Sequence, residues 1–155
     1  MAETVLTTDD ALAVFFPLFN EIGILAQLSA ALFEARMPDG YLTNQFAVLN
    51  HLIRVKDGRT PMELAGAFQV PKTTMTHTLG LLEKRGHVRL EENPKDGRSK
   101  LVWLTDAGRQ FRDSALAAAA PDMAVLARTF GPERAAQLIP HLSALREIMD
   151  AARAE

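Results

Sequence analysis

The chain contains no cysteine, which excludes disulfides, thiolate metal sites and thiol-based redox sensing. Its four histidines, at positions 51, 77, 87 and 141, stand on different predicted elements without the close spacing of a zinc site. No glycine-rich phosphate-binding loop follows a predicted strand, and the aspartates at 57, 96 and 106 are explained as turn and cap residues. We therefore predict no metal, no cofactor and no enzymatic activity.

An excess of basic charge is also missing, because the 155 residues carry a formal net charge of −2. This balance argues against indiscriminate nucleic-acid binding. The distribution is uneven, however: residues 72–109 hold eight Lys or Arg against five acids, a local +3 that leaves −5 elsewhere. With 48% apolar residues, the length suits a single domain over 1–155 that buries about two-thirds of its extended surface.

A signal peptide and a membrane span are not expected either. The apolar run over 11–19 follows Glu3, Asp9 and Asp10 rather than basic residues. Asn20 and Glu21 should end this run well short of the ~20 residues of a span. We predict a cytoplasmic protein without a membrane partner.

The most informative segment, residues 60–109, begins with two short helical patterns. Thr60-Pro61-Met62-Glu63 combines a capping hydroxyl, a proline at the first helical position and a reciprocal glutamate. Gln69-Val70-Pro71 interrupts the pattern, and a second helix is expected over about 72–85. This spacing predicts a helix-turn-helix. The expected inward residues of the first helix are Met62, Leu64, Ala65 and Phe68.

The second helix has two different faces when it is projected at ~100° per residue. One side is expected to pack inward and consists of Met75, Thr78, Leu79 and Leu82. The other side has small or hydrogen-bonding residues and no aliphatic one: Thr73, Thr76, His77, Gly80 and Lys84. Such a face suits close approach to base edges in a major groove. The alternative is an ordinary solvated helix face.

A charged hairpin follows the second helix. Gly86 should end the helix, and strands are expected at 88–90 and 101–104. Asp96-Gly97 between them is a turn signal. The turn displays Lys95, Arg98 and Lys100, where a DNA-backbone or minor-groove contact is sterically possible. A charged tip can simply be solvated, but its position after a polar-faced helix favours a DNA-binding wing.

Apolar helices are expected on both sides of this segment. A long helix over 9–36 should have Thr8 or Asp9 as its cap, and Pro17 should bend it or mark its beginning. Thr43 is expected to cap a helix to about Val55. Thr105 should cap another, with a kink or break at Pro121. The last helix carries an a/d seam, kinked near Pro140 and suited to internal packing or a two-fold dimer: Ala135, Leu138, Leu142, Leu145, Met149 and Ala152.

Four stretches together resemble the MarR-type winged helix-turn-helix regulators: Leu64-Ala65, residues 82–88 (LEKRGHV), residues 93–98 (NPKDGR) and residues 104–108 (LTDAG). The match covers about a third of the chain. The resemblance implies that the second helix enters the major groove, that Arg98 with its partner Asp96 reaches the minor groove, and that the terminal helices pair in a dimer. His77 departs from the family, where an arginine often stands, and so does Gly80.

The sequence thus predicts a mainly α fold with a small β-hairpin wing. The DNA-binding region is expected at 42–109, and helical dimerisation regions at 9–36 and 106–153. The predicted function is a homodimeric repressor that binds an inverted-repeat operator and is released by an effector. The alternative is a winged-helix module for protein contacts alone. The candidate DNA contacts are Lys72, Thr73, Thr74, Thr76, His77, Lys84, Lys95, Asp96, Arg98 and Lys100.

The resemblance also implies a small aromatic or phenolic anion as effector, bound in a cleft between the terminal helices and the DNA-binding region. His51 and Arg54, on the helix that begins near Thr43, are the candidate residues for lining this cleft. The alternative is that both are surface or core-rim residues.

Overall fold

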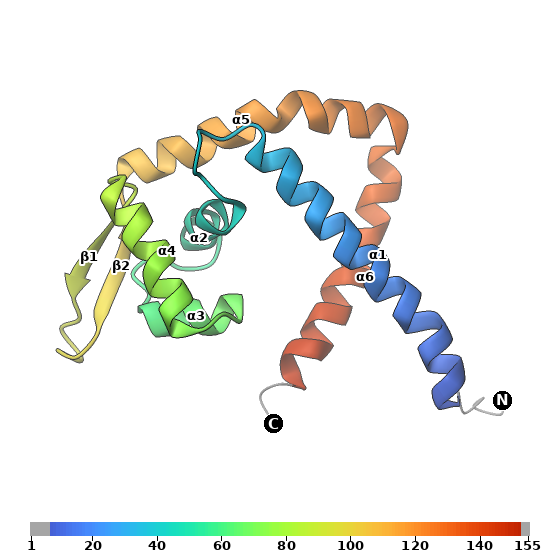
Figure 1. Cartoon of the computed structure of the whole chain (residues 1–155), viewed down its shortest axis with the longest axis horizontal. Coiled ribbons are helices and arrows are strands. Elements are labelled where there is room, and N and C mark those ends of the chain that lie inside the picture. The colour runs from blue at the N-terminus through green and yellow to red at the C-terminus, as the bar shows by residue number, and fades with distance from the viewer. Residues whose placement is uncertain (1–6, 153–155) are drawn as a thin grey trace. The chain divides into compact units, whose positions relative to one another are not determined.

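The computed structural model describes residues 7–152, so the ends of the predicted domain at 1–6 and 153–155, including Arg153 of the predicted dimerisation region, lie outside it. Within the described residues the chain is mainly helical with one antiparallel hairpin, which confirms the predicted fold class (Figure 1). The elements are α1 Thr8–Glu34, α2 Thr43–Arg54, α3 Pro61–Phe68, α4 Lys72–Lys84, β1 Val88–Glu92, β2 Lys100–Leu104, α5 Asp106–Thr129 and α6 Pro132–Ala151.

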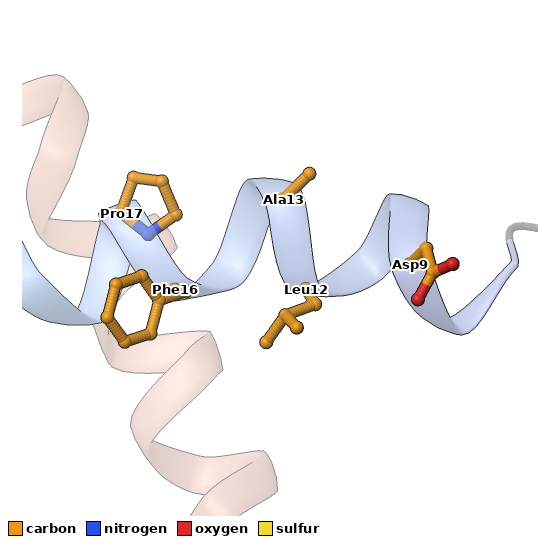
Figure 2. A pocket seen from close by; sticks show the side chains of 5 residues that line it. All are labelled: Asp9, Leu12, Ala13, Phe16 and Pro17. Carbon is orange, nitrogen blue, oxygen red and sulfur yellow. The ribbon is translucent and has the colours of Figure 1, made fainter.

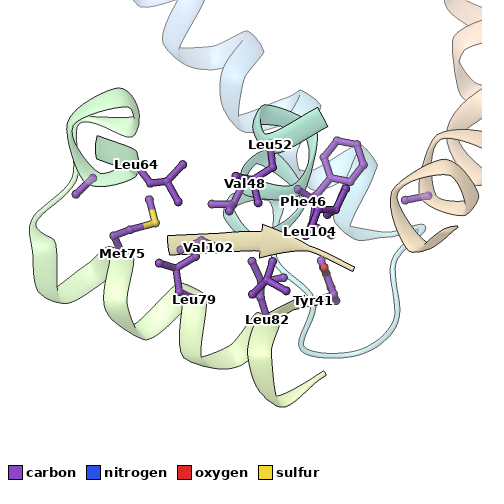
Figure 3. Close-up of a cluster of buried hydrophobic side chains, with 14 of the residues drawn as sticks. Tyr41, Phe46, Val48, Leu52, Leu64, Met75, Leu79, Leu82, Val102 and Leu104 are labelled. Atoms are coloured by element: carbon purple, nitrogen blue, oxygen red, sulfur yellow. The ribbon is translucent and has the colours of Figure 1, made fainter. Parts of the chain in front are cut away.

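Two compact units divide between Ala118 and Ala119. The core of the first unit is formed by side chains from α2, α3, α4 and the hairpin (Figure 3). The predicted inward face of α4 is buried, as are Phe46, Leu49 and Leu52 of α2. This shared core fixes the helix-turn-helix and the wing against each other.

Met62 was wrongly assigned to the inward stripe of α3, because its side chain is 65% exposed. Leu64 and Ala65 are buried as predicted. At ~100° per residue, Met62 lies about 200° around the helix from Leu64 and therefore faces away from the core.

Two of the predicted caps are placed differently in the structure. Thr7 caps α1 in a capping box with Asp10, one residue before the expected position. Thr43 is the first residue of α2 and not its cap. The last residue of α1 takes that role: Glu34 Oε1 accepts the Thr43 backbone N–H at 2.8 Å and its hydroxyl at 2.9 Å. These hydrogen bonds hold the pKa of Glu34 below its ordinary value.

The predicted caps of α3 and α5 are confirmed. Thr60 and Glu63 form the reciprocal capping box. The Thr105 hydroxyl accepts the Gly108 N–H at 3.0 Å at the start of α5. Both caps satisfy backbone donors that a helix cannot satisfy internally.

Prolines lie inside three helices without ending them. Pro17 is within α1, Pro121 within α5 and Pro140 within α6. One alternative of each prediction is therefore wrong, namely a helix start at Pro17 and a break at Pro121, whereas a bend or kink at these prolines is compatible with the continuous helices. Each proline removes one backbone donor, and these helices are long enough to continue through the remaining hydrogen bonds.

The long helix α1 has no buried residue in the chain, although it is strongly apolar. It runs past Asn20 and Glu21, and by length and composition alone it could cross a membrane, contrary to the expectation that these residues would end the apolar run. That match is weak support for a span, because an apolar helix of a soluble assembly passes the same test. Figure 2 shows an open hollow on its first half, lined by Asp9, Leu12, Ala13, Phe16 and Pro17.

Candidate nucleic-acid interface

The helix-turn-helix is held by a tight link between α3 and α4. Gln69 ends α3 in the left-handed conformation, with φ 56°. The Val70 N–H then donates to the Ala65 carbonyl at 3.1 Å, and Pro71 begins α4 as its N-cap. Because the turn has only three residues outside the helices, it fixes the direction in which α4 leaves α3.

The face of α4 opposite the core is open to solvent. The candidate DNA contacts of this helix are all exposed: Lys72, Thr73, Thr74, Thr76, His77 and Lys84. The Thr76 hydroxyl donates to the Lys72 carbonyl at 2.8 Å, so its methyl group and oxygen lone pairs remain available outward. Gly80 has no side chain, and an added Cβ there would meet no atom within 4 Å, so the helix backbone is open to close approach at this point.

The carboxyl end of α4 is tied to two other segments. Arg85, the C-cap, donates through Nη2 to the Gly40 carbonyl at 3.1 Å, and its guanidinium carbon lies 4.7 Å from the Tyr41 ring centroid. Tyr41 in turn stacks on Phe111 of α5 at 4.1 Å. The orientation of α4 is thus linked to the loop before α2 and to the first turns of α5.

His87 is the junction of this aromatic cluster. Its Nδ1 lies 3.1 Å from the Tyr41 hydroxyl, and its ring stacks on Phe111 at 4.7 Å. Burial, and then the positive charge of Arg85, lowers the pKa of His87. The neutral imidazole is therefore the form that this packing favours.

The wing is a regular hairpin with a structured tip. Its register runs from Val88 opposite Leu104 to Glu92 opposite Lys100, which leaves residues 93–99 as the loop. Lys95, Arg98 and Lys100 are all exposed. Within residues 7–152 the Arg98 guanidinium has no hydrogen bond or ion pair, so its charge projects freely from the loop.

The resemblance pairs Asp96 with Arg98, and the structure shows how these two residues meet. The Asp96 carboxylate accepts the backbone N–H of Arg98 at 3.0 Å. The carboxylate therefore shapes the turn through the Arg98 backbone and leaves the guanidinium available for a phosphate or a groove.

The two candidate cleft residues lie in different settings. The His51 ring packs against Phe68 at 5.3 Å, and its Nε2 lies 3.2 Å from Arg59 Nη1. Burial, and then the charge of Arg59, lowers the pKa of His51. Arg54 is exposed in the last turn of α2. The contacts of the imidazole are thus with Arg59 and Phe68, not with Arg54.

Sequence reasoning missed the residues that support this surface. It assigned no role to Asn93 and Ser99, which bond to each other at 2.9 Å across the wing loop, or to the Arg85–Tyr41 contact. For Asn93 a signal was present, because asparagine before a turn often accepts an N–H two residues later. The partners of Arg85 and Tyr41 are set by tertiary packing and have no local signal.

Comparison with known proteins gives a consistent result. The profile of the MarR family matches residues 39–99. The transcriptional regulator HosA of Escherichia coli O111:H- is 35% identical over 122 residues, covering 75% of this chain and 85% of HosA. The transcriptional activatory protein BadR of Rhodopseudomonas palustris is 34% identical over 98 residues, covering 62% of this chain and only 54% of BadR.

Solved structures share the fold. Wild-type MarR of E. coli in its apo form aligns with a TM-score of 0.70 at 26% identity, covering 83% of this chain and 96% of MarR. The regulator PcaV of Streptomyces coelicolor, solved with its natural ligand, aligns with a TM-score of 0.66 at 24% identity, covering 91% of this chain and 96% of PcaV.

Proposed function

Because this chain belongs to the MarR family of transcriptional regulators, we propose that it is a homodimeric repressor which binds an inverted-repeat operator and is released by a small-molecule effector. In this proposal residues 42–109 form the DNA-binding region, and residues 9–36 and 106–153 the dimerisation region of one cytoplasmic domain.

The observation that carries DNA binding is the exposed polar face of α4 together with a cationic wing. Figure 1 shows the ribbon of α4 beside the two strands of this wing. The α4 side chains are small or hydrogen-bonding, as direct contact with base edges requires. The wing adds three exposed cations, Lys95, Arg98 and Lys100, which suit phosphates or a minor groove. The proposed contacts are Lys72, Thr73, Thr74, Thr76, His77, Lys84, Lys95, Asp96, Arg98 and Lys100.

The dimer is supported by apolar surface that a lone chain leaves uncovered. On α1 Leu12, Phe16 and Leu25 are 61–67% exposed. On α6 the seam residues Leu138 and Met149 are about half exposed, at 49% and 48%. On each of the two helices these side chains leave apolar surface of a kind that monomeric soluble proteins rarely expose, whereas a second copy would bury it.

The proposed effector is a small aromatic or phenolic anion. PcaV, which shares this fold, was solved in complex with its natural ligand. Near His51, the Arg59 guanidinium supplies a positive charge, and the Phe68 ring supplies an apolar face. Arg54, exposed in the last turn of α2, would add a second cation. The ligand would release the protein from DNA by favouring a dimer in which the distance between the two α4 helices does not match the spacing of the half-sites.

A winged-helix module used only for protein contacts is the second candidate function. It would be favoured by an apolar or acidic outer face on α4, because protein interfaces have apolar, often aromatic cores. The exposed residues of α4 include no aliphatic side chain, and their one acid, Glu83, is outnumbered by Lys72 and Lys84. DNA binding is therefore the better-supported function.

Selection of bound duplexes from random DNA tests the function class and the symmetry together. We expect an inverted repeat with half-sites centred ~34 to 36 Å apart, bound with ~10⁻⁸ to 10⁻¹¹ M affinity that falls steeply with salt. A promoter fusion carrying that site then gives the sign of regulation, repression on our proposal. No enriched sequence, or only asymmetric sites, would contradict the proposal.

A further inference from the structure

The tip of the wing is held by hydrogen bonds and almost no apolar packing. Residues 94–98 are all exposed, and only Asn93 and Ser99, which face each other at the base of the loop, are half-buried. Two backbone turns follow one another: the Asp96 N–H donates to the Asn93 carbonyl at 3.1 Å, and the Ser99 N–H donates to the Asp96 carbonyl at 3.0 Å. The conformation of the tip therefore depends on the hydrogen bonds that join these two turns.

Asn93 joins the two turns through both the oxygen and the nitrogen of its side-chain amide. Its Oδ1 accepts the Lys95 backbone N–H at 3.0 Å, and its Nδ2 donates to the Ser99 hydroxyl at 2.9 Å. The Ser99 hydroxyl donates onward to the Asp96 carbonyl at 3.2 Å. One side chain thus links the first turn, the second turn and the base of the hairpin.

This network ends at Arg98. Asp96, whose carbonyl receives the Ser99 hydroxyl, accepts the Arg98 N–H on its own carboxylate at 3.0 Å. The Arg98 guanidinium contacts no other described residue through a hydrogen bond or ion pair. The chain of hydrogen bonds that begins at Asn93 holds the Arg98 backbone, which sets the direction in which the side chain leaves the loop.

We propose that Asn93 is a positioning residue for DNA binding, which acts through Ser99 and Asp96 to hold Arg98 in the conformation that enters the minor groove. This inference rests on the proposed DNA-binding function. An arginine on an ordered loop binds more tightly than one on a mobile loop, because the backbone does not have to be ordered when the complex forms. Loss of the hydrogen bonds of Asn93 should therefore weaken DNA binding only when Arg98 is present.

A double-mutant cycle tests this directly, with the full-length protein and the inverted-repeat duplex recovered by selection. The variants are Asn93→Ala, Ser99→Ala, Arg98→Ala and the combination of Asn93→Ala with Arg98→Ala. We expect Asn93→Ala and Ser99→Ala each to raise Kd by roughly 3- to 10-fold, the range of one hydrogen bond. In the Arg98→Ala background, Asn93→Ala should change Kd by less than about 2-fold.

Lys95→Ala is the matched control within the same loop. Lys95 contributes only its backbone N–H to the hydrogen-bond network of Asn93. Truncation of its side chain therefore removes a charge and leaves the network intact. Its effect on Kd should fall as salt rises and should add to that of Arg98→Ala without coupling. Ser99→Ala breaks the same Asn93 bond from the other side, so the test survives if Asn93→Ala folds poorly.

The outcomes distinguish the positioning role of Asn93 from the DNA-binding role of the wing. Unchanged Kd for both Asn93→Ala and Ser99→Ala, or an equal loss with and without Arg98, would overturn the positioning role while leaving DNA binding in place. An Arg98→Ala protein that binds as tightly as the parent would overturn the function proposed for the wing itself, and the positioning role with it.

Discussion

At the scale of single residues, the wing and α4 differ in the groove that each would meet. Arg98 is placed for a minor groove, whose donor and acceptor pattern is degenerate, so Arg98→Ala should weaken all good sites similarly, by ~1 to 3 kcal/mol. It should also flatten the salt dependence by about one phosphate per subunit. Thr76→Ala and His77→Ala should instead change which bases are preferred, because the major groove distinguishes all four base pairs.

The measurement is the affinity of each variant for a panel of single-base operator variants at two salt concentrations. If Arg98→Ala changed base preference while Thr76→Ala and His77→Ala lowered affinity uniformly, the division of roles between wing and helix would be wrong, even in a protein that binds DNA.

Two glycines make a matched pair for stability. A Cβ on Gly108 would overlap the backbone carbonyl of His87, at the point where α5 starts beneath the hairpin, whereas a Cβ on Gly66 of α3 would meet nothing within 4 Å. Gly108→Ala should therefore lower the free energy of unfolding by ~1 to 3 kcal/mol or more, as overpacking does. Gly66→Ala should raise it by ~0.4 to 1 kcal/mol, because alanine loses less entropy in a helix. Urea denaturation of both variants checks the pair, and equal effects would contradict it.

At the scale of elements, the cluster around His87 joins α4, β1, α5 and the loop before α2, and it should make stability depend on pH. Burial lowers the pKa of His87 and of His51 in the folded chain below the ordinary value of 6.5. The unfolded chain thus binds more protons near pH 6, and stability falls as pH drops through this range. The loss is complete below the folded pKa values.

Denaturation at pH 7.5 and at about pH 5 measures this effect in the parent, in His87→Gln and in His51→Gln. Comparison of each variant with the parent at the same two pH values cancels the contribution of Glu34 and Glu63, whose lowered pKa values make the unfolded chain begin to take up protons on these carboxylates near pH ~5. We expect each single variant to lose part of the pH dependence. A parent protein that is equally stable at both pH values would refute the assignment of these two imidazoles as neutral in the fold.

The elements that sequence predicted well are those with local chemistry. Thr60 and Glu63 determine the start of α3 through a capping box, and the period of Met75, Leu79 and Leu82 determines the inward face of α4. Asp96-Gly97 likewise marked the wing turn, where the Ser99 N–H returns to the Asp96 carbonyl at 3.0 Å.

The elements that were predicted poorly depend on neighbours distant in sequence or on helix length. Glu34 caps α2 from nine residues away, which no local pattern at Thr43 indicates. Proline lowers helix propensity at Pro17 and Pro121, but the surrounding helices are long enough to continue. In the candidate site, the exposed face of α4 could be predicted from the helical period. The hydrogen bonds that hold the Arg98 backbone could not, because they depend on how Asn93 and Ser99 lie across the loop.

At the scale of the whole molecule, the apolar surfaces of α1 and α6 demand an explanation, since none of their described residues is buried. A two-fold dimer would bury them and place two copies of α4 one helical turn of DNA apart.

Leu138→Lys combined with Leu142→Lys puts two charges into the predicted seam of α6, where desolvating them would oppose association. Light scattering should give twice the 17.0 kDa chain mass for the parent and a lower mass for the variant. Gln137→Lys, at an exposed polar position of the same helix, is the control and should remain dimeric.

The double-lysine variant should also lose most of its affinity for the inverted repeat, because each monomer contacts one half-site alone. A double-lysine variant that stays a well-behaved dimer would show that the α6 seam is not the interface, and the exposed face of α1 would then have to account for the pairing alone.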